Sequence, residues 1–203
     1  MSSSTKRRVN TRFIAGTAML SALSFVLQSF EFAIPVLIPP FIKFDFSDLP
    51  ALIGSFAYGP LAGITIEFIK NLLHCAESQS ATVGELSNFI LGAVFTGTAG
   101  AIYKYKKNKT TAFVGGILGS VLLGIISIPA NYFVVYPFYY KAFNLAPEAV
   151  LGMYQAILPK VKNILQCLLI FNLPFTIIKG LISTAITMLV YKHLSPILKG
   201  IQK

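Results

Sequence analysis

The chain has 203 residues, of which 55% are hydrophobic and 12% charged, and its mean hydropathy is +0.70. A soluble domain of this length would carry about twice that charged fraction, and several apolar stretches could cross about 30 Å of hydrocarbon. The composition therefore predicts an all-α integral membrane protein with a single domain over residues 1–203. The net charge of +10 does not predict nucleic-acid binding, because the basic residues gather beside apolar stretches, as at the cytoplasmic ends of membrane helices, next to acidic lipid headgroups.

A basic tail over residues 1–11 precedes the first apolar stretch, Phe13–Phe30. It could be mistaken for a secretory signal, but no small-residue cleavage site follows, so we expect a retained first membrane helix with the tail in the cytoplasm. Ala15, Ala18 and Ala22 place small residues on one face of this helix, which allows another helix to approach closely. Such patterns also occur often by chance, so from the residues alone this face is only a candidate partner surface.

The next segment predicts a long outer loop followed by a broken helix. The loop, Glu31–Ser47, is rich in proline and phenylalanine, and Phe44 within it is a candidate ligand contact. If the stretch Leu49–Leu73 were one crossing, the next basic loop would fall on the side opposite the N-terminal tail, against the positive-inside rule. Two crossings, divided at Gly59-Pro60, restore the rule. The second of six helices is then Asp48–Tyr58, short and irregular at about 16 Å.

The predicted third helix carries four polar side chains on one face, at the spacing i, i+3, i+4, i+7: Glu67, Lys70, Asn71 and His74. Glu67 and Lys70 can pair within the membrane, which would lower the cost of burying both. One interpretation is a proton or cation relay. We favour a structural polar stripe that holds the short second helix, with His74 near the rim of a ligand pocket.

Three further apolar stretches complete the six predicted helices: Val83–Tyr103, Ala112–Tyr136 and Leu173–Tyr191. The fifth and sixth are joined by a second long outer segment, Pro137–Phe171. Within it Ala149–Phe171 is amphipathic, which predicts an interfacial helix or lid. Both long segments lie outside in this topology, with both termini cytoplasmic, so we expect a ligand to arrive from outside.

Lys179, about six positions into the last apolar stretch, is the best indication of function, because an ionisable group within the membrane usually marks a site. The preceding Asn172-Leu173-Pro174 predicts a helix start, with a capping amide and then proline in the first turn. Together with Asn131 and Thr176, Lys179 would offer an amide, a hydroxyl and an ammonium to one polar edge of a ligand. The alternative is that Lys179 reaches the headgroups and Asn131 bonds a neighbouring helix.

The sequence holds no nucleotide-binding loop, metal-binding spacing or catalytic motif of the common types. Cys75 and Cys167 are too few and too far apart to predict a disulfide framework or a zinc site. We therefore expect neither an enzyme nor a bound metal or cofactor. The seventeen phenylalanines and nine tyrosines would suit a flat aromatic ligand, although core packing explains them equally well.

Four runs of sequence carry a resemblance to a known family: Phe44–Leu52, Phe56–Gly63, Glu67–His74 and Pro174–Gly180. Through them the chain resembles the riboflavin-specific substrate-binding subunits (S components) of energy-coupling factor (ECF) transporters, from its first predicted helix to its last. The resemblance implies six helices and an outward pocket formed by the first outer loop and the outer halves of the fourth to sixth helices. It also implies residence in a prokaryotic plasma membrane.

The resemblance assigns residues as well. It implies that Asn131, Thr176 and Lys179 contact the flavin. Asn172 is a further candidate contact, which the resemblance does not assign. Members of the family often have asparagine where this chain has Thr176, so that contact is less well supported. The first-helix A-x-x-x-A surface, here Ala18 and Ala22, would dock the transmembrane coupling subunit.

The expected function is therefore high-affinity riboflavin capture for an ATP-driven vitamin uptake transporter, with a coupling subunit, two ATPase subunits and a toppling motion all implied by resemblance. Riboflavin would be the transported ligand rather than a cofactor. The sequence leaves two rivals. One is a self-sufficient proton-coupled carrier that uses Glu67 and Lys70 as its relay. The other is a membrane enzyme, for which no reactive cluster is visible.

Overall fold

The computed structural model describes residues 11–199, so the predicted basic tail lies almost wholly outside the described residues. The described chain is helical apart from its loops and one two-stranded antiparallel hairpin in the first loop, which pairs Phe32 with Phe44. The elements in chain order are α1 (Thr11–Ser29), β1 (Phe32–Ala33), β2 (Lys43–Phe44), α2 (Asp48–Tyr58), α3 (Pro60–His74), η1 (Cys75–Glu77), α4 (Val83–Tyr105), α5 (Lys109–Ala130), η2 (Asn131–Val135), α6 (Tyr136–Ala142), α7 (Pro147–Gln155), α8 (Ile164–Cys167), η3 (Leu168–Asn172) and α9 (Leu173–Lys199).

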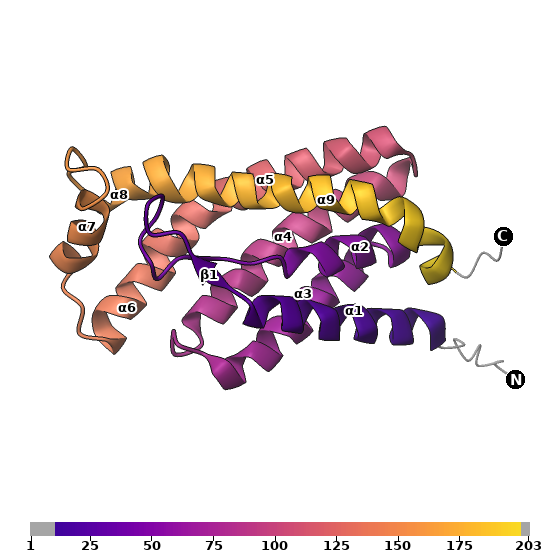
Figure 1. The fold of residues 1–203 in the computed structure, drawn as a ribbon, viewed down its shortest axis with the longest axis horizontal. Helices are drawn as coiled ribbons and strands as arrows, with labels where there is room; N and C mark the ends of the chain where they lie inside the picture. The colour runs from indigo at the N-terminus through magenta and orange to yellow at the C-terminus, as the bar shows by residue number, and fades with distance from the viewer. Residues whose placement is uncertain (1–10, 200–203) are drawn as a thin grey trace, which may run out of the picture.

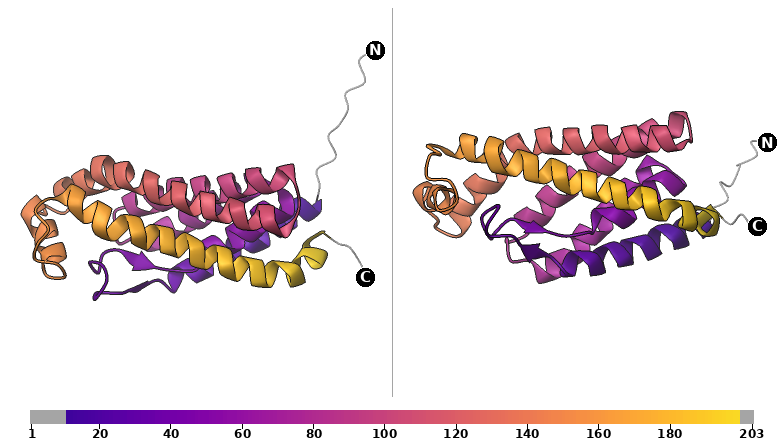
Figure 2. Two further views of the ribbon diagram at one scale, coloured as in Figure 1. Left: turned by 90° about the horizontal axis from the view of Figure 1, so that it is seen from above. Right: turned by 45° about the horizontal axis from the view of Figure 1, so that its top comes forward.

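The long helices run side by side along the long axis of the molecule (Figures 1 and 2). The start of α1, the turn between α4 and α5, and the end of α9 lie at one end, while α7 lies at the other (Figure 1). Four helical stretches of the described chain are long and apolar enough to cross a membrane: Thr11–Ser29, Val83–Tyr105, Lys109–Ala142 and Ile164–Leu194. Large apolar side chains such as Met19, Leu61 and Leu189 point outward, as expected for surfaces that contact lipid.

The short second helix is confirmed at the predicted residues, and its environment explains how so short an element is tolerated. Eight of the eleven residues of α2 are buried, so neighbouring helices rather than lipid surround it. Gly59 separates α2 from α3 with φ of +106°, a conformation that glycine adopts without steric cost, and Pro60 then begins α3. The backbone N–H of Gly59 donates to the carbonyl of Ser55, which closes the last turn of α2.

The predicted bounds of the last two long helices were wrong. One helical stretch continues from α5 through α6 to Ala142, and the other begins at Ile164 rather than Leu173. Asn163, not Asn172, caps the latter: its side-chain oxygen accepts from the backbone N–H of Gln166 at 2.9 Å. Lys179 therefore lies about 22 Å along this helix, instead of the expected depth of about one and a half turns.

Widened helical turns explain why two prolines do not end these helices. The π-helical turns η2 and η3 end one residue before Tyr136-Pro137 and Leu173-Pro174 respectively. Proline lacks an N–H and its ring clashes with the preceding turn of an α-helix, and a wide turn at that point relieves both problems. The second outer segment is therefore shorter than predicted. The amphipathic stretch Ala149–Phe171 is divided between α7 and the start of the last helix.

The buried apolar side chains form three clusters along the bundle. The cluster at the α7 end joins α6, α7 and α8 through buried side chains that include Tyr136, Val150, Tyr154 and Cys167. A middle cluster packs α2 against α4 and α5, and a third packs α1 against α2 and α3. Cys75 and Cys167 are both free thiols, in agreement with the sequence.

Candidate functional site

A cavity of about 470 Å³ is lined by residues from most of the chain, including Val150 and Met153 of α7. The first loop, the segment before α4, the start of α4, the α5–α6 helix, α7 and α9 all contribute to its wall. Asn131, Thr176, Lys179, Asn172 and His74, all expected from the sequence to contact a ligand, line this cavity.

Phe44, the sixth expected contact, does not line the cavity. It is 7% exposed and packs against Phe46 and Phe175, with ring centroids 5.2 and 6.1 Å away. Successive side chains of an extended segment point to opposite sides, so its neighbours Lys43 and Asp45 face the cavity instead.

Asn131, Thr176 and Lys179, the predicted polar edge, line the same cavity and differ in the hydrogen-bonding groups that they leave free. The Nδ2 of Asn131 donates to the backbone carbonyl of Ser127 at 2.7 Å, so Oδ1 is the acceptor that remains for a ligand. Thr176 lies on the cavity wall one turn before Lys179. Lys179 Nζ donates to Asp45 Oδ2 at 2.8 Å and lies 3.6 Å from Asp48 Oδ2. One ammonium N–H is thus held by Asp45, while the others are available to the cavity.

Asp48 joins Lys179 to the polar stripe of α3. Its Oδ1 accepts a hydrogen bond from Lys70 Nζ at 2.7 Å, while its Oδ2 faces Lys179. Lys70 also donates to Ser47 Oγ at 2.7 Å and lies 2.8 Å from Glu67 Oε2, in a poorly aligned geometry. Lys70 and Glu67 are at most 1% exposed. The geometry supports the structural interpretation of the stripe, because Lys70 ties α3 to the start of α2.

The remaining members of the stripe extend it to α1 and α4. Asn71 Nδ2 donates to the backbone carbonyl of Glu67 at 2.8 Å, and Gln28 on α1 donates to Asn71 Oδ1 at 3.2 Å. His74 Nδ1 lies 3.1 Å from Glu85 Oε1 on α4. The carboxyl group of Glu67 fits against α4 only because position 92 is glycine: a Cβ there would lie 2.2 Å from Oε2.

The counter-ions of the two intramembrane lysines were missed by sequence reasoning. The sequence placed Asp45 in the first outer loop and Asp48 at the first residue of the short second helix, but both side chains are buried. Burial alone would raise the pKa of Asp45, but the charges of Lys179 and Lys70 outweigh it and lower that pKa below its ordinary value. The sequence carried only an indirect signal for these counter-ions. Two buried cations require carboxylates nearby, and Asp45 and Asp48 lie just before and at the start of α2, a helix too short to cross the membrane alone.

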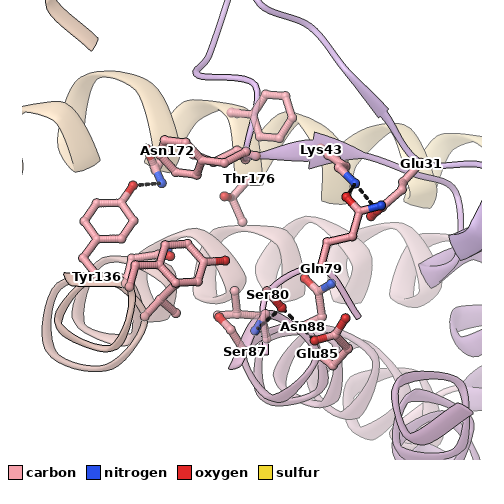
Figure 3. A pocket seen from close by; sticks show the side chains of 18 of the residues that line it. Glu31, Lys43, Gln79, Ser80, Glu85, Ser87, Asn88, Tyr136, Asn172 and Thr176 are labelled. Carbon is pink, nitrogen blue, oxygen red and sulfur yellow. Dashed lines mark hydrogen bonds and ion pairs between the residues drawn. The ribbon is translucent and has the colours of Figure 1, made fainter. Parts of the chain in front are cut away.

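A second missed group lies at the α7 end of the cavity. Tyr154 of α7 donates to Asn172 Oδ1 at 2.7 Å and lies 2.5 Å from the hydroxyl of Tyr136, toward which Asn172 Nδ2 also points at 3.3 Å (Figure 3 shows the Tyr136–Asn172 contact). Burial raises the pKa of Tyr154, so its hydroxyl stays protonated and able to donate. Asn172 therefore connects α7 to the two long helices, rather than capping a helix.

The small-residue face of α1 is separate from the cavity. Ala15, Ala18 and Ala22 are all exposed, while Gly16 and Leu20 on the other face are buried. In the described part of the chain, the small-residue face predicted from the sequence is therefore exposed and could contact a neighbouring molecule.

Comparison with known proteins gives a consistent result. The sequence model of a family described as "ECF transporter, substrate-specific component" matches residues 12–191. The riboflavin transporter RibU of Staphylococcus aureus is 38% identical over 193 residues, covering 95% of this chain and 94% of that protein. The riboflavin transporter FmnP of Bacillus subtilis is 32% identical, covering 88% and 90%. A solved structure, titled "Structure and mechanism of the S component of a bacterial ECF transporter", superposes with a TM-score of 0.72 at 35% identity, covering 93% of this chain and 98% of that one.

Replacing Lys70 by methionine tests the structural role of the stripe. The change leaves Asp48 and Glu67 buried without their shared cation, so we expect a loss of about 3–5 kcal/mol in the free energy of unfolding. Unfolding in detergent, followed by circular dichroism, measures it. Lys141→Met removes an exposed lysine from α6 and is the control, expected to change stability by less than about 0.5 kcal/mol. Equal stability of the two variants would contradict the structural role.

Proposed function

The chain belongs to the family of substrate-specific components of ECF transporters, and on that premise we propose that it captures riboflavin in the cavity. The observation that carries this proposal is the juxtaposition, in one cavity, of Asn131, Thr176 and Lys179 with an apolar wall, in a chain 38% identical along its length to a riboflavin transporter. A cavity of this size is within the usual range for small-molecule sites.

The polar edge suits the ring system of a flavin, which presents carbonyl oxygens beside an N–H. The free donors of Lys179 would meet a carbonyl oxygen, and Oδ1 of Asn131 would accept from the ring N–H. Thr176 offers a single hydroxyl oxygen, which can donate one hydrogen bond and accept others, but it lacks the separate carbonyl oxygen and NH2 group of an asparagine side chain. Phe41, Tyr139 and Phe175 line the apolar part of the wall, where flat rings can pack against them.

We propose that α1, α2, α3, α4, the α5–α6 helix and the α8–α9 helix are the six membrane helices of a prokaryotic plasma-membrane protein, with both termini cytoplasmic. The lysine-rich turn between α4 and α5 lies at the same end of the bundle as the start of α1 and the end of α9, which supports this orientation (Figure 1). The cavity then opens to the outside, where riboflavin is available.

Uptake of the captured flavin requires partners, since the sequence has no nucleotide-binding loop. We propose a membrane coupling subunit and two ATPase subunits, with the exposed Ala15, Ala18 and Ala22 face of α1 as the docking surface for the coupling subunit. Small residues on this face would let a helix of the partner approach the α1 backbone closely.

Substitution of Thr176 by valine tests the polar edge of the site. Valine has nearly the same shape but no hydroxyl, so we expect riboflavin affinity to fall by about five- to tenfold, the effect of one hydrogen bond. Quenching of flavin fluorescence by the purified protein measures the affinity. The matched control is Thr65→Val on the exposed face of α3, whose hydroxyl bonds only within its own helix. Failure of the wild-type protein to bind riboflavin would refute the proposed function itself.

Adding larger side chains to the Ala15, Ala18 and Ala22 face of α1 tests the proposed docking surface. The double substitution Ala18→Leu and Ala22→Leu adds bulk outside the cavity, so we expect riboflavin binding to persist while cellular uptake is lost. Ala101→Leu, at an exposed position of α4, controls for added bulk on a lipid-facing helix. Preserved uptake by the double variant would exclude this surface. Uptake that needs no partner and stops with an uncoupler would instead favour the proton-coupled carrier.

A further inference from the structure

The cavity wall carries more negative than positive charge. Four carboxylates line it, Glu31, Asp45, Asp48 and Glu85, against two lysines, Lys43 and Lys179. These six groups together carry a formal charge of −2, and Lys70, which lies behind the lining, also holds Asp48 at 2.7 Å. A ligand that brings its own negative charge would enter a partly enclosed space of the same sign, where water screens charges less than in bulk.

Both lysines of the wall are already held by carboxylates. Lys179 is paired with Asp45 and faces Asp48, as described above. Lys43 Nζ lies 2.5 Å from Glu31 Oε1 and 3.0 Å from the side-chain oxygen of Gln79, which reaches across to this pair in Figure 3. A bound anion could attract Lys43 only in competition with Glu31. The anion would then lie close to the Glu31 carboxylate, whose repulsion would offset the attraction of Lys43.

Glu85 differs from the other carboxylates of the wall, because hydroxyls and an imidazole hold it rather than an ammonium. Its Oε2 accepts from Ser78 and Ser80 at 2.8 Å each, and Oε1 lies 3.1 Å from His74 (Figure 3 shows Glu85 beside Ser80). The residue is 5% exposed, and it lies in the first turn of α4. Glu85 thus lines the cavity, and its carboxylate has no lysine or arginine ion pair among the described residues.

We propose that this charge arrangement makes the site selective for uncharged flavins over their phosphate esters, with Glu85 as the residue that sets the selectivity. This inference rests on the proposed function. A phosphate monoester carries about −1.5 to −2 charges at neutral pH, so it would meet a wall of the same sign, in which each lysine is already paired with a carboxylate. A neutral flavin loses nothing by the same contacts, since its hydroxyl groups can donate to carboxylates.

The test compares three ligands on the purified protein: riboflavin, riboflavin 5′-phosphate and the neutral riboflavin 5′-acetate, which adds bulk without charge. We expect the phosphate to bind at least about tenfold more weakly than the acetate, the size of effect that one or two nearby like charges produce. If the acetate binds as weakly as the phosphate, the inference is overturned, because the size of the ligand rather than its charge would then determine its affinity.

Glu85→Gln keeps the shape and the serine hydrogen bonds but removes the charge. We expect this variant to lower the ratio of the Kd for riboflavin 5′-phosphate to the Kd for riboflavin by about tenfold. Glu77→Gln removes the same charge from an exposed position outside the cavity wall and should leave the ratio unchanged. Asn88→Lys, at an exposed position of the wall, supplies a new cation on the same helix and should narrow the ratio even if Glu85→Gln does not fold.

The outcomes separate this inference from the proposed function. A wild-type protein that binds none of the three flavins refutes both. One that binds riboflavin and its phosphate equally, or whose ratio is unchanged by a folded Glu85→Gln (or, if that variant does not fold, by Asn88→Lys), refutes only the selectivity assigned here.

Discussion

The structure depends on one buried carboxylate that faces two cations. Asp48 accepts from Lys70 on α3 through one oxygen and faces Lys179 on α9 through the other, while Asp45 completes the pairing of Lys179. Removing any of these charges would leave a buried partner with one counter-ion fewer, which is more costly than breaking an exposed pair. The cluster thereby fixes the start of the short α2 against α3 and α9, and the first loop against α9.

Under the proposed function, this arrangement would link stability to ligand capture through the same atoms. Lys179 is held by Asp45 and lines the cavity, and the first loop that supplies Asp45 also supplies part of the cavity wall. A movement of that loop would therefore alter the position of the ammonium group. The polar edge is preorganised by charge pairs, which lowers the cost of ordering it when a ligand binds.

Local signals in the sequence predicted some elements well and others poorly, for identifiable reasons. The division between α2 and α3 followed from the positive-inside rule and the Gly59-Pro60 break, because turn chemistry acts within a few residues. The start of the last helix was missed, since a π-helical turn that accommodates Pro174 leaves no simple pattern. Lys179 was predicted because an intramembrane cation is conspicuous. Its counter-ions and Glu85 were not, because their burial depends on contacts far apart in the chain.

The most direct test of the account is a double-mutant cycle between Asp45 and Lys179. Asp45→Asn, Lys179→Met and the double variant are compared by their free energies of unfolding in detergent. If the two side chains form the buried pair described, the losses will not add, and the coupling energy will be at least about 1 kcal/mol. Losses that add to within about 0.3 kcal/mol would show that the two charges do not interact, and would contradict the account of how the ammonium group is held toward the cavity.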